Sequence, residues 1–124
     1  MVDFQNASFF KLKAVDPNTF NEMIYPLFVD GEQIIGAFQG IRDGVVMTNK
    51  RIITINVQGI TGKKKDFSSL PYSKIQAFSV ETAGTFDIDA ELELWFSGLG
   101  KVKLEFVTQV DIKAICKAIS SYVL

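Results

Sequence analysis

The chain has 124 residues, enough for about one domain with a buried core of its own. Apolar residues make up 48% of it and include 11 phenylalanines, a composition that excludes an intrinsically disordered chain. Its 13 basic and 14 acidic residues give a net charge of −1, so the chain has no general attraction for nucleic acid and any anion-binding site has to be local.

Several kinds of chemistry and location are excluded or favoured by single residue types. Histidine is absent, which excludes Ser–His and Cys–His nucleophile pairs and imidazole metal sites. The single cysteine, Cys116, cannot form an internal disulfide and lies in an apolar pattern, so we interpret it as an inert thiol. The first residues mix charged and apolar side chains, and no apolar run approaches the roughly 18 residues of a spanning helix, so we expect no signal peptide and a soluble cytoplasmic protein.

The N-terminal part of the chain predicts a short helix. Asp16-Pro17 combines a capping carboxylate with a proline at the first helical position. We expect a helix over about 17–24, ended by Pro26. Residues 1–26 are therefore interpreted as an N-terminal helical extension.

Three strands are predicted next. Apolar residues within Glu32–Gln39 indicate the first of them. Gly44–Thr48 and Arg51–Val57 are rich in β-branched residues, and the polar pair Asn49-Lys50 between them is typical of a hairpin turn.

The next two runs also have the composition of strands. They are Asp66–Leu70 and Ile75–Glu81. Pro71 lies between them, and because proline cannot donate a hydrogen bond to a neighbouring strand, it is incompatible with a central ladder position.

The clearest strand pair follows. Apolar and charged residues alternate over Asp87–Ser97 and over Lys101–Val107, which predicts a hairpin with one core face and one solvent face. Two registers keep both apolar sets inward, with Glu93 opposite either Lys103 or Glu105. Electrostatic attraction favours Lys103.

After Val107 the apolar period changes to that of a helix. Thr108 and Asp111 resemble a capping box with Asp in place of Glu. The apolar residues that then fall on one helical stripe are Ile112, Ile115, Cys116, Ile119 and Val123.

Together these elements predict a mainly β (α+β) domain. A short helix is followed by about seven antiparallel strands and an amphipathic C-terminal helix. Residues 27–124 are expected to form an antiparallel β-barrel or sandwich, partly open, with the last helix closing one end.

The segment MTNKRIITINVQGITGKKKDFSSLPYSKIQAF, together with this element order, resembles the bacterial pleckstrin-homology (PH) domain family of the stand-alone type. Chains of that family share a Thr-Asn-Lys-Arg turn and a Pro-Tyr-Ser-Lys-Ile segment, and the resemblance covers nearly the whole chain. It implies a PH-like barrel capped by a C-terminal helix, assembly into ring-forming homo-oligomers and no enzymatic activity. Other PH domains often bind phosphoinositide headgroups between their first two strands, where Gln39–Gly44 here offers one arginine beside an aspartate.

No catalytic, cofactor or metal site is predicted. Asp87, Asp89, Glu91 and Glu93 share a strand face and could be imagined as paired carboxylates. Their regular alternation with apolar residues is, however, typical of a solvent-exposed face next to a lysine-bearing strand.

Three consecutive lysines, Lys63, Lys64 and Lys65, are the strongest local concentration of positive charge. The glycines before them lack the spacing of a Walker phosphate loop. Lysines commonly protect a sheet edge from mispairing, and this is the simpler interpretation. The alternative is contact with an anionic lipid or another phosphate-containing ligand, assisted by Lys50 and Arg51.

The leading functional hypothesis is a non-catalytic interaction module that forms a homo-oligomer, for which the resemblance implies a ring, and acts as a scaffold for itself or for another protein. A small barrel has a limited interior, yet the mean hydropathy is +0.20 and the net charge is small, so apolar side chains should remain outside. Alternation sends Trp95 outward, and tryptophan is common at interface centres. Phe9 and Phe10 offer a second apolar patch. An anionic membrane surface is the alternative partner, and nucleic acid is not expected.

Overall fold

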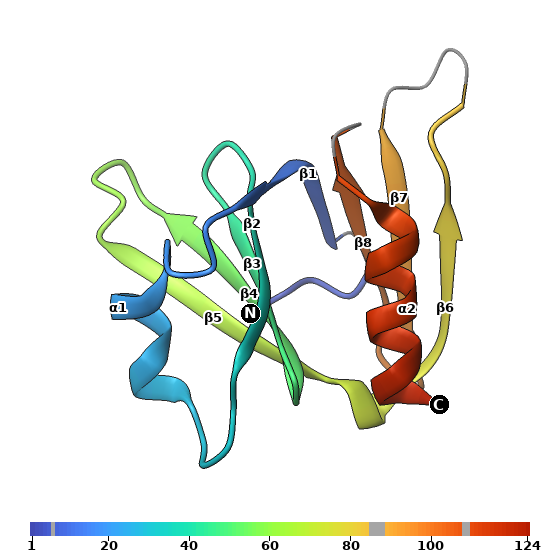
Figure 1. The fold of residues 1–124 in the computed structure, drawn as a ribbon. Coiled ribbons are helices and arrows are strands. Elements are labelled where there is room, and N and C mark those ends of the chain that lie inside the picture. Colours follow the sequence, from blue (N-terminus) through green and yellow to red (C-terminus); the bar gives the residue numbers. More distant parts are fainter. Residues whose placement is uncertain (6, 85–88, 108–109) are drawn as a thin grey trace.

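The computed structural model describes residues 1–5, 7–84, 89–107 and 110–124 (Figure 1). Within these residues a single sheet has the strand order β5-β4-β3-β2-β1-β8-β7-β6. The strands are β1 (Ala7–Val15), β2 (Ile34–Gln39), β3 (Gly44–Thr48), β4 (Arg51–Gln58), β5 (Lys64–Pro71), β6 (Ile75–Glu81), β7 (Ala90–Phe96) and β8 (Gly100–Phe106). The helical elements are α1 (Asn21–Ile24), η1 (Tyr25–Leu27), η2 (Tyr72–Lys74) and α2 (Ile112–Val123).

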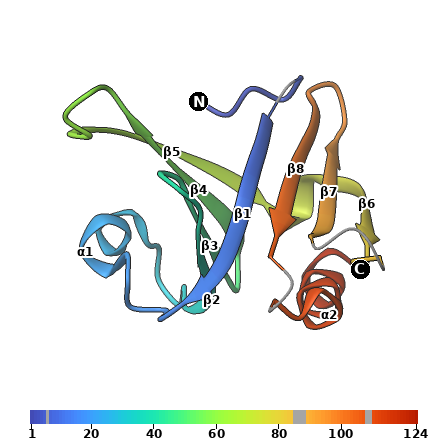
Figure 2. The same ribbon diagram turned by 90° about the horizontal axis from the view of Figure 1, so that it is seen from above.

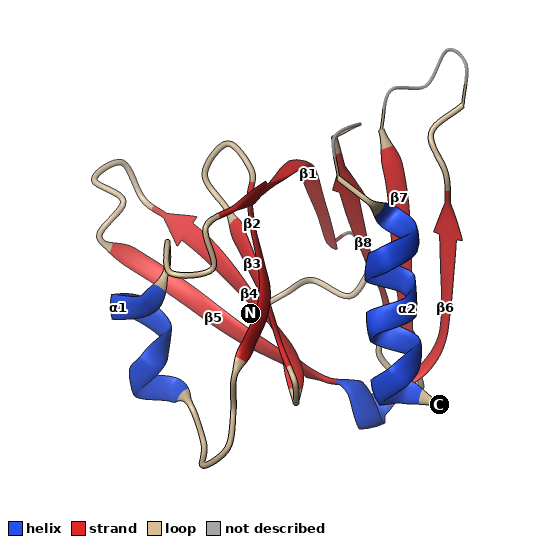
Figure 3. Cartoon of the chain, viewed as in Figure 1, coloured by secondary structure: helices blue, strands red, loops and turns tan. Residues whose placement is uncertain are grey.

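The mainly β fold with a C-terminal helix is confirmed, with one more strand than expected. The sheet is not closed, because β5 and β6 are its two edges and η2 connects them. All neighbouring strands are antiparallel except β1 and β8, which run parallel. The sheet bends into two halves, one of strands β2–β5 and one of strands β6–β8. Helix α2 lies beside β6–β8, and α1 lies beside β2–β4 (Figures 2 and 3).

Strand β1 connects the two halves of the sheet, and the sequence pattern did not predict it. It lies within residues 1–26, where we expected helical structure. Ala7–Phe9 pair with β8, and Lys13–Val15 pair with β2. Between these segments the register shifts and Lys11 adopts a φ of 52°. Because an extra residue at such a bulge breaks the period of two, Phe9 and Leu12 both point inward and the alternation that identifies a strand is lost.

The helix expected over 17–24 is shorter, since α1 begins only at Asn21. Asp16 does not cap it. Its carboxylate accepts a hydrogen bond from the Asn18 N–H at 2.8 Å, and its carbonyl accepts one from the Thr19 N–H at 2.9 Å. A side chain that bonds to the backbone two residues ahead stabilises a turn in competition with a helix. The Asp-Pro pair therefore marks a turn before α1.

The apolar side chains form two cores, which lie on opposite faces of strands β2–β5. The main core lies between the two halves of the sheet and α2, and the second lies between α1 and strands β2–β4 (Figure 1). Strand β3 is buried along its whole length because Val45 and Met47 face the main core while Val46 faces the second. The buried members of the second core are Phe20, Ile24, Ala37, Val46, Ile53 and Ile55.

The predicted hairpin is present as β7 and β8, and its register places Glu93 opposite Lys103, as expected. The same register places Glu91 opposite Glu105. Burial, a hydrogen bond with Asp89 and the nearby negative charges raise the pKa of Glu105. Asp87, the expected first residue of this strand, lies outside the described residues.

The C-terminal helix α2 has the predicted phase. Ile112, Ile115 and Ile119 are buried, while Cys116 is half-buried. Asp111 caps the helix by accepting a hydrogen bond from the Ala114 N–H at 3.1 Å. The capping-box partner Thr108 lies outside the described residues. In the part of the chain that the structure describes, no helix has the length and apolar character needed to span a membrane.

Candidate functional site

The acidic side chains of β7 are arranged as a surface rather than as a metal centre. Glu93 forms an ion pair with Lys101, and Glu91 forms one with Lys103, each at 3.5 Å. Among the residues with described positions, no group of three or more Cys, Asp or Glu side chains is placed to hold a metal ion. The hairpin carboxylates therefore have a structural explanation in their cross-strand lysines.

Arg51 was a candidate anion contact, but its guanidinium is occupied within the protein. Its Nε and Nη2 donate hydrogen bonds of 2.9 Å to the two carboxylate oxygens of Glu32. Nη2 also donates to the Leu27 carbonyl at 2.7 Å, and Nη1 donates to Ser69 Oγ at 2.9 Å. The Thr48 hydroxyl donates to the same carboxylate at 2.7 Å. The guanidinium therefore joins β4 to η1, to the loop before β2 and to β5.

Glu32 is the centre of this network, and its side chain has no exposed surface. Burial acts to raise the pKa of Glu32, but the hydrogen bonds from Arg51, Thr48 and the Val29 N–H, with the charge of Arg51, lower it overall. A buried carboxylate held in this way is a structural ion pair.

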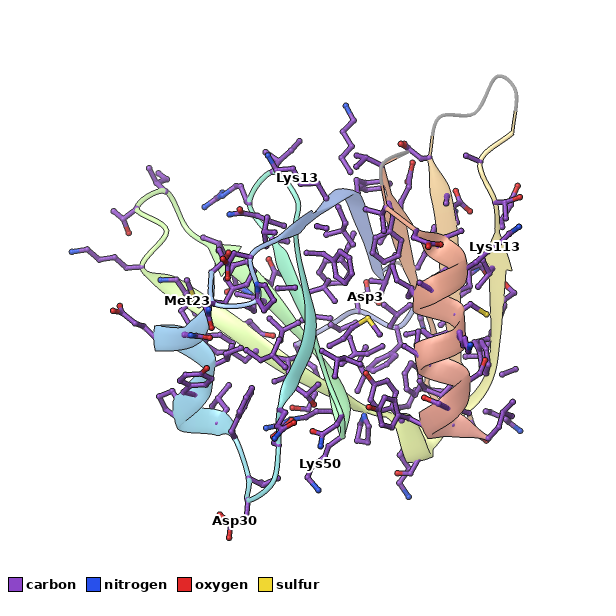
Figure 4. The ribbon with its side chains drawn as sticks, in the orientation of Figure 1. Asp3, Lys13, Met23, Asp30, Lys50 and Lys113 are labelled. Carbon is purple, nitrogen blue, oxygen red and sulfur yellow. The ribbon has the colours of Figure 1, made fainter. Side chains whose placement is uncertain are left out.

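The candidate cations do not form one cluster. Arg51 is opposite Pro71 at one end of the β4–β5 ladder, whereas Lys64 is opposite Gln58 at the other end. The two positions are separated by the length of β4, about 23 Å at 3.3 Å per residue. Figure 4 shows Lys50 at the end of the molecule away from Lys13. Lys50 and Arg51 therefore cannot act with the lysine triplet on one small ligand.

A different set of cations lies near the triplet, at the end of the sheet that carries the β2–β3 and β4–β5 turns (Figure 1). We call this surface the turn end and define it as Phe10, Lys11, Lys13, residues 40–43 and residues 59–65. Lys63, Lys64 and Lys65 are all exposed there, on the last residue of the turn and the start of the edge strand β5.

The two turns of this surface are held side by side. Arg42 Nη2 donates a hydrogen bond of 2.8 Å to the Gly59 carbonyl, and the Val57 N–H donates one of 3.4 Å to Asp43 Oδ1. Gly40 allows the first turn to approach β1, because a Cβ at this position would lie 2.9 Å from the Phe10 carbonyl oxygen.

Lys11 and Lys13 reach the same surface from β1. They line a pocket of about 430 Å³ together with Gln39, Gly40 and Ile41. The sequence pattern does not indicate these lysines as candidates, because they fall in residues 1–26, where it predicts a helical extension. Only the pairing of β1 with β2 and β8, which are distant in sequence, places them beside Gly40 and Ile41 of the β2–β3 turn.

The aromatic candidates for a subunit contact lie in different environments. Trp95 is 43% exposed on β7, and the Lys101 ammonium lies 5.0 Å from its ring centroid. Phe10 is 58% exposed. Phe9 was expected to belong to the same surface patch, but it is buried in the main core because it precedes the bulge of β1 on the inward side.

Comparison with known proteins agrees with this architecture. The model of the family described as bacterial PH domain matches residues 3–123. The uncharacterized protein YjqA of Bacillus subtilis is 44% identical over 102 residues, which cover 81% of this chain and 82% of that protein.

Two crystal structures from Shewanella are similar to the fold. A DUF1696 family protein with a PH domain from Shewanella loihica has 43% identity and a TM-score of 0.82, covering 92% of this chain and 98% of that one. A PH domain from Shewanella amazonensis also has 43% identity, with a TM-score of 0.69 and coverage of 89% and 90%.

Proposed function

The chain belongs to the bacterial PH domain family, and from this we propose that it is a non-catalytic interaction module that self-assembles into a homo-oligomer and serves as a scaffold. The resemblance to stand-alone members of the family supports a ring, which requires a repeated head-to-tail contact that closes on itself. A free cysteine supports a cytoplasmic location.

The observation that carries this proposal is the outer face of β6, β7 and β8. Helix α2 packs on the inner face of these three strands (Figure 1), and Trp95, which alternates with the buried Leu94 and Phe96, is exposed on the outer face beside Lys101. The adjoining edge strand β6 has six consecutive uncharged residues, Ile75–Val80, whereas the other edge, β5, carries lysines and Pro71. An edge without charges or proline is suited to contact with another chain.

Light scattering coupled to size-exclusion chromatography tests the proposal. We expect a mass of several subunits at about tens of micromolar protein, and Trp95→Ser should lower it because tryptophan is an anchoring residue of interfaces. Val29→Ser, which changes an exposed apolar residue in the loop before β2, is the matched control and should keep the wild-type mass. A monomer mass for the wild type at this concentration would refute self-assembly.

A second candidate function is the binding of an anionic lipid or another phosphate-containing ligand by Lys63, Lys64 and Lys65. Its support is their common exposure at the turn end beside Arg42. Lys50 and Arg51 are no longer part of this candidate site.

Vesicle sedimentation tests this second function. Replacing all three lysines by alanine should weaken binding to vesicles that contain phosphatidylglycerol by about tenfold or more, since each cation near such a surface contributes about 1 kcal/mol. The control variant Lys50→Ala/Lys74→Ala/Lys113→Ala removes the same charge elsewhere on the molecule. Equal weakening by both triple variants would show a nonspecific effect of net charge.

A further inference from the structure

We propose that Ile41 and Ile60 insert together into an anionic lipid bilayer and that the cations of the turn end contact its headgroups. This inference rests on the second candidate function and adds an apolar anchor to it. The contact is with a bilayer surface rather than with a single soluble phosphate.

The two isoleucines occupy matching positions in neighbouring turns. Gln39-Gly40-Ile41 and Gln58-Gly59-Ile60 repeat the same three residues, one at the β2–β3 turn and one at the β4–β5 turn. Their side chains are 85% and 106% exposed, so neither contributes to a core. Turns favour glycine, asparagine, aspartate and serine, and folding therefore gives no reason for isoleucine at either tip.

Ile41 and Ile60, at the tips of these turns, act as a pair because the two turns are hydrogen-bonded to each other. The hydrogen bonds from Arg42 to the Gly59 carbonyl and from the Val57 N–H to Asp43 hold the turns together. Phe10, itself exposed, lines a pocket with residues 40–43 and adds a third apolar side chain to this end. Scattered exposed apolar residues are ordinary, but three at one end of a sheet form a surface.

The positive charge around Ile41 and Ile60 indicates which kind of partner this surface would bind. Six cations belong to the turn end: Lys11, Lys13, Arg42, Lys63, Lys64 and Lys65. The turn end as defined holds one carboxylate, Asp43, and the nearby Asp66 is paired with the N-terminal ammonium. This end is therefore positive although the whole chain has a net charge of −1.

An anionic bilayer is complementary both to the exposed apolar side chains of the turn end and to its positive charge. Its headgroups present negative charge, and its acyl region accepts apolar side chains directly beneath. A soluble phosphate would use the cations and leave the isoleucines in water. A second copy of the chain would have to offer an acidic surface with an apolar pocket.

The first experiment compares sedimentation with vesicles of phosphatidylglycerol and phosphatidylcholine and with vesicles of phosphatidylcholine alone. We expect the wild type to bind the first and not the second, more weakly at high salt. The variant Ile41→Ser/Ile60→Ser should lose about tenfold or more in partition coefficient, because each isoleucine loses its favourable transfer from water. Leu99→Ser is the control. Leu99 is also exposed at a turn, between β7 and β8, beyond the Ile75–Phe96 pair at the opposite end of the molecule.

The second experiment detects insertion itself. In a Trp95→Phe background, Ile60→Trp should give a blue-shifted emission on anionic vesicles and be quenched by brominated acyl chains. Leu99→Trp in the same background should show neither effect. An Ile60→Trp emission that vesicles leave unchanged would refute insertion.

The possible failures are distinguishable. If the serine double variant binds as well as the wild type while the lysine triple variant does not, the bilayer anchor is refuted and charge-based binding remains. If the wild type binds neither kind of vesicle, both are refuted and self-assembly is unaffected, because its measurement is a mass. If the double variant instead lowers the oligomer mass, the tips contact a second copy and the inference is overturned.

Discussion

At the scale of single residues, the contrast between Lys50 and Arg51 shows how neighbours in sequence acquire different roles. The sequence groups both with the lysine triplet as candidate contacts for an anionic ligand. Arg51 is instead held by Glu32, Leu27 and Ser69, whereas Lys50 is exposed. No local pattern identifies Glu32 as the partner, because the two residues are brought together only when β2 and β4 join the same sheet.

The first prediction concerns this ion pair. Arg51→Met should lower the free energy of unfolding by about 3–5 kcal/mol, because it leaves the fully buried carboxylate of Glu32 without its charged partner. Lys50→Met, at the neighbouring exposed position, should change it by less than about 0.5 kcal/mol. Urea unfolding of both variants measures the difference, and equal effects would contradict the assigned role of Arg51.

The pH dependence of that difference follows from the pKa of Glu32. Its folded pKa lies below the ordinary value of 4.5, so the ion pair stabilises the folded state above pH 4.5 and this stabilisation is lost as the pH falls through the lower folded pKa. The gap between wild type and Arg51→Met should therefore narrow in acid. A gap of constant size down to about pH 2 would be inconsistent with it.

At the scale of elements, the sequence was most informative where a strand-like composition or a residue period continues without interruption. The strands β3 and β6 have the predicted bounds, and the β7–β8 register and the buried stripe of α2 agree with prediction. The failures occur where a local feature interrupts the period. The bulge at Lys11 concealed β1, and the Asp16 turn resembled a helix cap.

The second prediction tests the phase of α2. Ile119 has no exposed surface, so Ile119→Asp should unfold the domain or destabilise it by at least about 3 kcal/mol through an unpaired buried charge. Lys117 is exposed on the same helix, and Lys117→Ser should have little effect. Circular dichroism during thermal unfolding makes the comparison. Similar losses from both variants would mean that the helix presents a different face to the sheet.

At the turn end, too, the sequence identifies only some of the residues of the candidate site. The exposure of Lys63, Lys64 and Lys65 agrees with the sequence pattern. Their neighbours Lys11 and Lys13 could not be identified, because their position depends on a strand that the pattern did not reveal. The repeated Gln-Gly-Ile triplet was visible in the sequence, but it becomes meaningful only once the two turns are known to be adjacent.

At the scale of the whole molecule, two cores share the same strands, so neither should melt alone. Ile52 and Ile53 are successive residues of β4, both fully buried, and face the main and the second core respectively. The third prediction is that Ile52→Ala and Ile53→Ala each destabilise the protein by about 2–5 kcal/mol. Both variants should retain one cooperative transition in calorimetry. A separate early transition in Ile53→Ala would show that the second core and α1 unfold independently.

The parallel pairing of β1 with β8 has a consequence for synthesis on the ribosome. Ala7 leaves the ribosome long before its ladder partner Val102, whereas β2–β5 can pair with strands next to them in sequence as soon as they emerge. The β2–β5 meander can therefore form while β1 still has one side unpaired, and the two halves of the sheet join only after β8 has left the exit tunnel. Non-local contacts of this kind slow folding, because the intervening chain must be closed into a loop before the contact is made. A nascent chain that is arrested before β8 should accordingly expose the inward side chains of β1, including Phe9 and Leu12, to water and to chaperones.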